Sequence, residues 1–490
     1  MFRNVRVSVS ERTARLEREW QELCACYLPL QPEDSIWRYH RKPLTDEPEQ
    51  GWKLHVSATV LNATRVLRKV APSLVDRGIS FKAPSSLKEV MRLNSGASEG
   101  YTQVGKIITV YPRTPKEAVD LAGHLHKLTI RMGAPTVPFD LRYSATSNVF
   151  YRFGAFRPLE IEHGSRKRTP AVRGPDGKLI PDCREQPKPD WVMDPFTKRH
   201  KRRRKQTAEN PLAAAYGVLR VLAQRGKGGV YQAVDFTVSP PRLCLIKEGR
   251  KYGELNWDGR DGRWYIRNEE RVLSELRASG VDVPRVYSSF ELEGNAYLVT
   301  EFVDGETLHS WLHRLQRRMP IARVLKLGIQ LAEFFSQMHA AGWVWRDCKP
   351  LNILVTRQGG LKPLDFEGAC RTNRPDAMLW GTPGFIPPEW RAADKQTGLP
   401  DDLYALGSVL YLLATGRVPE IIESVEPEKL RHNIPRELSN LIMSLLSSEP
   451  QRRPSAKEAV ARLGWTLRRV AASQKLWQPR TTGEFSKQIA

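Results

Sequence analysis

Two stretches of the C-terminal half decide the fold: residues 345–355 read WRDCKPLNILV and residues 364–368 read LDFEG. Together they carry the carboxylates of Asp347 and Asp365, with the cation of Lys349 and the amide of Asn352 between them. Hard Mg²⁺ takes oxygen ligands of these kinds and neutralises the charge that builds on phosphoryl oxygens. The two stretches therefore indicate a site for phosphate chemistry.

Two weaker signals lie upstream, in a region that is expected to be mostly strand (215–303) and to precede a mostly helical region (306–470). Residues 226–231, GKGGVY, lie between two expected strands, where glycines let backbone amides approach a triphosphate without Cβ clashes. Lys247 is the only charge on the apolar strand LIK (245–247), placed to reach nucleotide phosphates. Glu269, on the following helix, is its expected ion-pair partner. Taken singly, each could be an ordinary turn or a surface charge.

In this order and spacing the four signals resemble the protein kinases. The resemblance implies a bilobal domain in which Asp347 orients the substrate hydroxyl and accepts its proton, while Lys349 steadies the transferring phosphoryl group. It also implies ATP or GTP as the donor, with Mg²⁺ held by Asn352 and Asp365. The nucleotide-binding residues that it implies are Gly226, Gly228, Gly229, Lys247 and Glu269.

Three further residues fit the kinase pattern, and two depart from it. Glu389 fits the end of the activation segment with Arg453 as its buried partner, and Asp402 fits the helix that braces the catalytic loop. Trp345 replaces the usual His before Arg-Asp, which alters packing but not the chemical groups. Glu367 replaces the Gly of Asp-Phe-Gly, which argues against switching by a flip of that loop.

The N-terminal half alternates strand and helix signals and predicts a compact α/β unit, so the whole chain is expected to be α+β. The expected strands span 52–58, 79–82, 106–111 and 149–153. One helix is expected to begin near Ala63, to be ended or kinked by Pro72, and to be closed by Gly78. Another is expected over 114–132, begun by the capping box of Thr114 and Glu117. Apolar residues at three- and four-residue steps predict a long helix over 321–335.

An α/β domain before a kinase with Asp-Phe-Glu resembles the lyase–kinase portion of class III and IV lanthipeptide synthetases, over about residues 25–470. The N-terminal likeness rests on GWKLHVSA (51–58), ISFK (79–82), GKIITVYP (105–112) and YRFG (151–154), with PDG (175–177) and PD (181–182) in the following segment. The Lys-x-His element at 53–55 is similar to one in phosphothreonine lyases, which eliminate phosphate from phosphothreonine.

The resemblance implies a β-elimination site in the N-terminal domain, and the residues suit that chemistry. Lys53 and His55 lie two apart on an expected strand, so their side chains share a face. Lys82 is the implied base, a neutral amine whose pKa must fall from ~10.4 through burial and neighbouring cations. His55, protonated, would donate to the departing phosphate oxygen. The implied phosphate-binding residues are Lys53, Arg92, Lys106, Arg142 and Arg152.

A phosphate-making domain fused to a phosphate-eliminating one predicts a lanthipeptide-type dehydratase. It would phosphorylate Ser or Thr in a ribosomal precursor peptide with a leader, then eliminate phosphate to leave dehydroalanine or dehydrobutyrine. Two alternatives remain open: a signalling Ser/Thr kinase with a phosphopeptide-binding N-terminal domain, and a basic nucleic-acid-binding scaffold with an inactive kinase. The full synthetases carry a further cyclase domain. Cyclisation is therefore expected from a separate cyclase, or not at all, or from a longer chain.

Composition sets the remaining expectations. The 490 residues contain no run of ~18 uncharged apolar residues and no secretory signal, so a cytoplasmic protein without a membrane span is expected. The net charge of +23 predicts attraction to anions. The basic block at 198–205 is interpreted as a solvated linker, not a nucleic-acid patch. The expected domains are a lyase-like domain (1–160), a Pro/Gly-rich basic interdomain segment (161–212), a kinase-like domain (213–472) and a polar tail (473–490).

Overall fold

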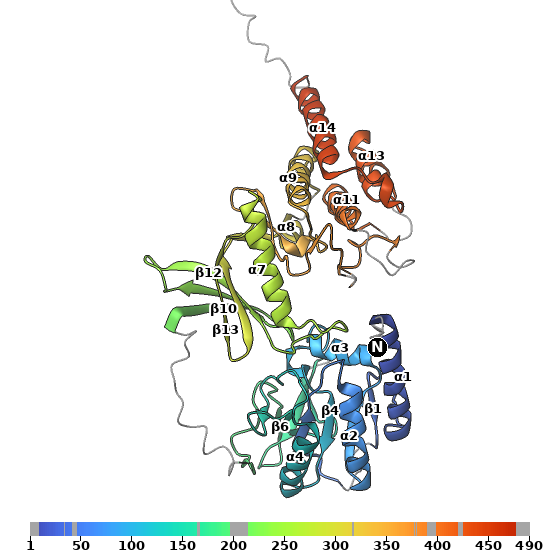
Figure 1. Cartoon of the computed structure of the whole chain (residues 1–490), viewed down its shortest axis with the longest axis vertical. Helices are drawn as coiled ribbons and strands as arrows, with labels where there is room; N and C mark the ends of the chain where they lie inside the picture. Colours follow the sequence, from blue (N-terminus) through green and yellow to red (C-terminus); the bar gives the residue numbers. More distant parts are fainter. Residues whose placement is uncertain are drawn as a thin grey trace, which may run out of the picture. The chain divides into compact units, whose positions relative to one another are not determined.

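The chain divides into two compact units in the computed structural model (Figure 1). Unit 1 comprises Met1–Arg267 and Ser288–Val299, and unit 2 comprises Asn268–Tyr287 and Thr300–Ala490. The structure describes residues 9–33, 35–41, 47–163, 167–196, 214–315, 318–376, 378, 380–389, 398–419 and 425–476. The basic block at 198–205 and most of the expected tail lie outside these residues.

A six-stranded sheet forms the centre of the N-terminal domain. Its strands are β1 (Trp37–Tyr39), β2 (Gln50–Val56), β3 (Ser80–Pro84), β4 (Ile108–Tyr111), β5 (Leu141–Arg142) and β6 (Val149–Ala155). They lie in the order β1-β3-β4-β2-β6-β5, and every neighbouring pair is antiparallel. The four expected strands are confirmed. The central position of β2 follows from pairing on both of its edges and could not be predicted from the sequence alone.

One face of this sheet is covered by helices (Figure 1). They are α1 (Val9–Tyr27), α2 (Ala63–Asp76), α3 (Leu87–Ser95) and α4 (Pro115–Thr129). Trp20, Leu67 and Leu121 from the helices join Leu54 and Val110 from the strands in one buried core. Because side chains alternate along a strand, the polar residues between the core positions face the other side of the sheet.

Of the two effects expected of Pro72, it does not end helix α2, which continues to Asp76, just before Gly78. A proline inside a helix forfeits one backbone hydrogen bond and costs about 3 kcal/mol. Val70, Ala71 and Leu74 are fully buried on the core side of the same helix. Burying a large apolar side chain contributes roughly 1.5–3 kcal/mol, so the core face outweighs the proline.

Part of the expected interdomain segment is built into the N-terminal domain. Strands β7 (Glu160–His163), β8 (Lys167–Arg173) and β9 (Leu179–Pro181) form a small sheet of their own. Beyond it, Val192 and Phe196 enter the N-terminal core, and the Phe196 ring stacks on Tyr151 with centroids 3.8 Å apart. The Pro- and Gly-rich composition conceals both these strands and the two apolar anchors.

A second sheet follows, in the order β10-β11-β12-β14-β13. Its strands are β10 (Tyr216–Gln224), β11 (Gly229–Asp235), β12 (Arg242–Gly249), β13 (Val286–Leu292) and β14 (Asn295–Glu301), with α7 (Gly262–Ala278) between β12 and β13. This is the strand-rich lobe that the kinase resemblance implies.

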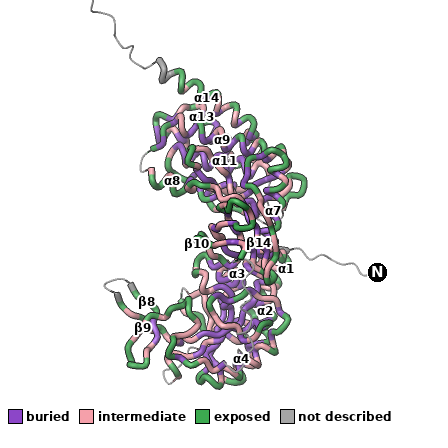
Figure 2. Tube along the Cα trace, turned by 90° about the vertical axis from the view of Figure 1, so that its left-hand side faces the viewer, coloured by how far each residue is buried: buried purple, intermediate pink, exposed green. Residues whose placement is uncertain are grey.

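Unit 2 is mainly helical. Its helices are α8 (Leu308–Leu315), α9 (Ile321–Ala340), α11 (Leu399–Thr415), α12 (Pro427–Leu430), α13 (Arg436–Leu445) and α14 (Ala456–Leu476). Short strands β15 (Gly305–Thr307), β17 (Ile353–Thr356) and β18 (Leu361–Pro363) form one sheet, and β16 (Trp343–Val344) pairs with β19 (Cys370–Arg371). Much of α9 and α11 is buried (Figure 2). The α+β class and the long helix after residue 320 are confirmed. Across the described residues, no helix is both long and apolar enough to cross a bilayer.

Candidate active sites

The sheet register aligns four predicted lyase residues on the face opposite the helices. His55 on β2 lies opposite Thr109 on β4, and Thr109 lies opposite Lys82 on β3. On the other edge of β2, Lys53 lies opposite Arg152. Directly opposed residues share a face, as do residues two apart on one strand. The predicted base, acid and two phosphate-binding cations therefore come from three different strands to one surface.

Asp140 is a member of this cluster that the sequence analysis missed. Its carboxylate accepts a hydrogen bond from His55 Nδ1 at 2.5 Å and pairs with Lys106 Nζ at 3.1 Å. All three side chains are buried. Burial alone would raise the pKa of Asp140, but His55 and Lys106 beside it hold that pKa below its usual value. Asp140 stands just before the two-residue strand β5, where no sequence pattern marks it.

The segment after β9 adds two more charges to the same face. Asp182 accepts from Arg152 Nη2 at 2.5 Å, and both side chains are almost fully buried. Arg184 lies close enough for its positive charge to lower the pKa of Lys82 and of Lys106. Asp182 belonged to the motif quoted for this segment, whereas nothing in the sequence singled out Arg184.

The environment of the two strand lysines lowers their pKa values strongly. Burial is the main cause for Lys82, with Arg184 adding to it, and brings its pKa to about 8. For Lys53, burial together with the charges of Arg152 and Lys82 brings the pKa to about 7. The Lys82 ammonium also lies 4.0 Å from the centroid of the Trp37 ring. Both amines thus have a sizeable neutral fraction near pH 8, as a base requires.

His55 differs from the expectation in its protonation. Burial lowers the pKa of His55 to about 4, and the opposing effect of Asp140 is smaller. With these neighbours the imidazole is neutral at pH 7 and donates its Nδ1–H to Asp140. The lone pair of the neutral ring is then on Nε2. The protonated His55 that the sequence analysis expected therefore requires a further negative charge beside the ring.

Arg92 and Arg142 make hydrogen bonds and ion pairs with other groups. Arg92 on α3 pairs with Glu89 at 3.2 Å and with Glu99 at 2.5 Å. Arg142 donates to the Thr136 hydroxyl at 2.9 Å and to a backbone carbonyl at 3.1 Å, and it lies over the Phe150 ring. Arg142 on β5 lies opposite Phe150, which lies opposite His55, so Arg142 shares the sheet face of the cluster. The contacts given above do not join either arginine to Lys53, His55 or Lys82, so a role in phosphate binding stays a prediction for both.

In unit 2 the predicted catalytic loop is closely hydrogen-bonded around Asp347. Lys349 Nζ donates to Asp347 Oδ2 at 2.8 Å and to the Thr382 hydroxyl at 2.9 Å. Thr382 donates to Asp347 Oδ1 at 3.1 Å, and the Asn352 amide donates to Asp347 Oδ2 at 2.9 Å. Burial raises the pKa of Asp347, and Lys349 opposes that rise. The carboxylate is thereby fixed in place with a cation beside it.

Trp345 supports the second acidic residue. The Trp345 indole is fully buried, stacks on Phe366 with centroids 5.4 Å apart, and donates to the Asp365 carbonyl at 3.0 Å. The expectation that this replacement alters packing without removing a chemical group agrees with these contacts. Glu269 accepts the Phe366 N–H at 3.2 Å, so α7 also contacts this motif.

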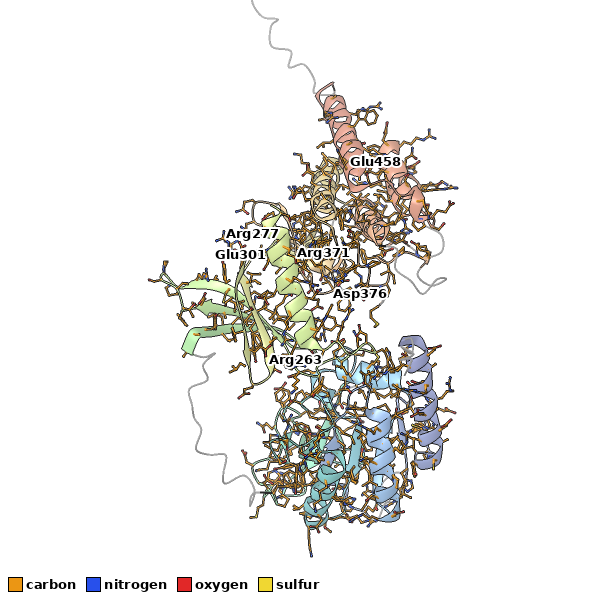
Figure 3. All side chains as sticks on the ribbon, in the orientation of Figure 1. Arg263, Arg277, Glu301, Arg371, Asp376 and Glu458 are labelled. Atoms are coloured by element: carbon orange, nitrogen blue, oxygen red, sulfur yellow. The ribbon has the colours of Figure 1, made fainter. Side chains whose placement is uncertain are left out.

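The bracing contacts expected from the kinase pattern are present. Asp402 accepts the backbone N–H groups of Trp345 and Arg346, each at 2.8 Å. Arg453 pairs with Glu389 at 2.7 Å. Arg346 itself pairs at 3.2 Å with Asp376 of the following segment; Figure 3 labels Asp376. The carboxylates of Asp402 and Asp376 therefore hold the start of the catalytic loop in place.

The side chains assigned to Mg²⁺ have suitable donor atoms. The Asn352 side chain donates two hydrogen bonds to Asp347, both from its amide nitrogen. Its amide oxygen is therefore the atom that would coordinate a cation. The charge of Asp365 raises the pKa of Asp347, which places the two carboxylates near each other. An amide oxygen and a carboxylate are oxygen ligands of the kind that Mg²⁺ takes.

The glycine-rich turn lies in unit 1 at the start of β11, and Lys247 on β12 lies directly opposite Val230. The predicted lysine is thus next to the turn, as the kinase resemblance implies. Its ion pair with Glu269 stays a prediction.

Beside the catalytic loop there is a mainly apolar hollow with a volume of about 700 Å³. Lys349 and Thr382, which both contact Asp347, form part of its wall together with Leu351. Its other apolar walls come from Leu312, Met319, Phe385, Leu412, Leu413 and Val418.

Comparison with known proteins identifies both halves. Residues 30–208 match the family described as "RamC, N-terminal domain", and residues 226–463 match the protein kinase domain. The chain is 31% identical over 398 residues to "Probable SapB synthase" of Streptomyces coelicolor, covering 78% of this chain and 41% of that protein. It is 32% identical over 186 residues to "Probable serine/threonine-protein kinase CPE1738" of Clostridium perfringens, covering 34% and 27%. The chain thus spans less than half the length of these relatives. The expected likeness to a lyase–kinase portion is confirmed at the level of its two domains.

Proposed function

Because the chain joins a RamC N-terminal domain to a protein kinase domain, we propose that it is a lanthipeptide-type dehydratase with a Ser/Thr kinase site and a phosphate-eliminating site. One observation supports the lyase half above all. Lys82, whose pKa is lowered, lies on the same sheet face as His55, Lys53 and Arg152. A neutral base next to an anion-binding cluster suits removal of a proton from a phosphorylated residue.

In the first step, a Ser or Thr hydroxyl of the peptide attacks the terminal phosphoryl group of ATP or GTP. Asp347 accepts the hydroxyl proton, and the Lys349 ammonium stabilises the oxygens of the transferring group. Mg²⁺, held by Asn352 and Asp365, would neutralise phosphate charge when bound. The raised pKa of Asp347 makes its carboxylate a better proton acceptor than an exposed aspartate.

In the second step, neutral Lys82 removes the α-proton of the phosphorylated residue. The electron pair forms the Cα=Cβ double bond, the Cβ–O bond breaks, and phosphate departs with a proton from His55. Arg152 and Lys53 hold the phosphate. Its negative charge raises the pKa values of Lys53 and His55, which supplies the protonated His55 that the free site does not favour.

The hollow beside Lys349 gives the peptide a place to bind next to the kinase site. Two sites on one chain hold the phosphopeptide at high effective concentration for elimination. Ring formation is a separate reaction on this proposal, assigned to a cyclase site other than the two described. All six cysteines are free thiols, and we place the reaction in the cytoplasm.

Mass spectrometry of a precursor peptide with leader, incubated with the protein, nucleotide and Mg²⁺, tests the proposal. Each modified residue should lose one water. Asp347→Asn should abolish phosphorylation and dehydration, yet still eliminate phosphate from a supplied phosphopeptide. In the reaction of the Lys82→Ala variant, the phosphopeptide should accumulate.

Two results would point to other functions. Phosphopeptide that accumulates with the unmodified protein and is unaffected by Lys82→Ala indicates a signalling kinase. Salt-sensitive binding of RNA or DNA without nucleotide turnover indicates a basic scaffold. Neither result is expected, because both predicted sites retain their full sets of ionisable groups.

A further inference from the structure

The glycine-rich turn of the kinase domain makes direct backbone contact with the N-terminal domain, within unit 1. Gly226 N–H donates to the carbonyl of Ser95, the last residue of α3, at 2.9 Å. The guanidinium of Arg225 reaches the carbonyl of Gly96 at 3.4 Å. The Gly226 amide, which the sequence analysis assigned to nucleotide, is therefore engaged by α3.

The approach at Gly226 is too close for any other residue. A Cβ atom at this position would lie 1.6 Å from the carbonyl oxygen of Asn94. That oxygen cannot easily move, because the buried Asn94 side chain donates to the Ala58 carbonyl at 2.9 Å and accepts from Gly105 N–H at 3.1 Å. Helix α3 therefore presents a fixed surface to the turn.

Arg250 makes a second connection. Its guanidinium lies 4.9 Å from the centroid of the Tyr101 ring in the N-terminal domain. The same group donates to the Arg225 carbonyl at 3.0 Å and to Gln224 Oε1 at 2.7 Å, both at the start of the turn. It also pairs with Glu248 at 2.8 Å. One side chain thus joins Tyr101 to β10, which precedes the turn, and to Glu248 on β12.

The chain beyond Arg250 adds apolar contacts. The Tyr252 ring lies against the backbone at Gly133, where a Cβ atom would meet ring carbons at 2.4 Å. Trp257 packs on the core of the N-terminal domain. Tyr252 and Trp257 lie in the segment of the kinase domain between β12 and α7. Their contacts therefore hold the same part of the strand-rich lobe that Arg250 holds.

We propose that the N-terminal domain positions the glycine-rich turn for nucleotide binding, with Tyr101 and Tyr252 as positioning residues. A turn rich in glycine loses much conformational freedom when it closes on a ligand. Holding it in place beforehand removes part of that cost. The inference rests on the proposed kinase activity. It adds that the nucleotide affinity of the kinase depends on the domain in front of it.

Binding of a non-hydrolysable ATP analogue with Mg²⁺ to the full chain, followed by calorimetry, tests this role. Tyr101→Ala should weaken binding by about 3- to 10-fold, the range expected for losing a partly buried cation–π contact. Tyr252→Ala should weaken it in the same direction, and Tyr101→Phe should restore it because the ring remains. In turnover, KM for nucleotide should rise while kcat stays near its original value.

Tyr27→Ala is the matched control, since Tyr27 lies at the end of α1 and makes none of these contacts. Wild-type affinity in both Tyr101→Ala and Tyr252→Ala would overturn the inference, as would equal weakening by Tyr27→Ala. Failure of the unsubstituted chain to bind nucleotide would overturn the proposed kinase activity and this inference with it. Normal nucleotide binding without peptide phosphorylation would count against the proposed function alone.

Discussion

His55 donates its Nδ1–H to Asp140 at 2.5 Å, in a pair that is almost completely buried. The second oxygen of the same carboxylate pairs with Lys106. Asp140 therefore fixes the orientation of the predicted acid and neutralises a buried cation at the same time. A carboxylate in this position stabilises the imidazolium form once phosphate binds, so it should matter for elimination without contacting substrate.

Replacing Asp140 with Asn should separate the two reactions. The amide can still accept the His55 hydrogen bond but carries no charge to stabilise the imidazolium, so elimination should slow by roughly 10²-fold or more. Phosphorylation should continue, and the phosphopeptide should accumulate in mass spectra. Because Lys106 loses its charged partner, the free energy of unfolding should fall by about 3–5 kcal/mol, as measured by thermal unfolding. Unchanged dehydration would show that the pair is only structural.

The pH dependence of elimination should report Lys82. Only the neutral amine can accept a proton, and its pKa of about 8 lies well below the ordinary value. With a supplied phosphopeptide at saturating concentration, kcat should therefore rise from pH 6, reach about half of its plateau near pH 8 and level off near pH 9. A falling limb at higher pH would give the pKa that His55 reaches beside bound phosphate. A rate that falls from pH 6 to pH 8 would contradict the assignment of Lys82 as base.

Lys53→Met should stabilise the protein while impairing elimination. Burial, Arg152 and Lys82 all disfavour the charged form of Lys53 and hold its pKa at about 7. A lysine whose pKa is lower in the folded state costs stability at every pH below its unfolded value, most fully below pH 7. Removing it should add about 1–3 kcal/mol at pH 6, measured by denaturant unfolding. Exposed Lys69 on α2 provides the control, because Lys69→Met should change stability by less than about 0.5 kcal/mol.

The kinase groups could be predicted because they are local. The catalytic stretch is short, and its resemblance to the protein kinases singles out Asp347 and Asn352; the contacts of Asp402 and Arg453 agree with the same pattern. The predicted effect of Trp345 on packing also agrees with the structure, because its ring stacks on Phe366.

The lyase cluster could be predicted only in part, because it depends on register. Lys53 and His55 share a face by alternation, but the alignment of Lys82 with His55 requires β4 to lie between their strands. Asp140 is 85 residues from His55 along the chain, and its loop has no periodicity. Arg184 lies in a segment whose composition indicated a linker. The burial of Val192 and Phe196 shows that this segment packs onto the N-terminal core.

Leu351 should influence which peptides the kinase accepts. Its side chain is 55% exposed and contributes to the apolar wall of the hollow beside Lys349. Leu351→Asp should raise KM for the precursor peptide by roughly tenfold, the loss expected when about 1.4 kcal/mol of apolar contact is removed. Nucleotide KM should change less than peptide KM, because Leu351 lines the hollow and is not assigned to nucleotide binding. Exposed Leu219→Asp on β10 is the control, and an equal effect from it would rule out a role for the hollow.

Trp345 should be required for kinase activity through both its ring and its N–H group. Trp345→Ala removes a fully buried indole, which should cost about 3–5 kcal/mol, and leaves the Asp365 carbonyl without its donor. Nucleotide-dependent phosphorylation should fall sharply, whereas elimination from a supplied phosphopeptide should persist, since that site lies in unit 1. Trp345→His should recover part of the phosphorylation, because an imidazole N–H can donate to the same carbonyl. If His recovers no more activity than Ala at a temperature where both variants are folded, stacking on Phe366 alone accounts for the tryptophan.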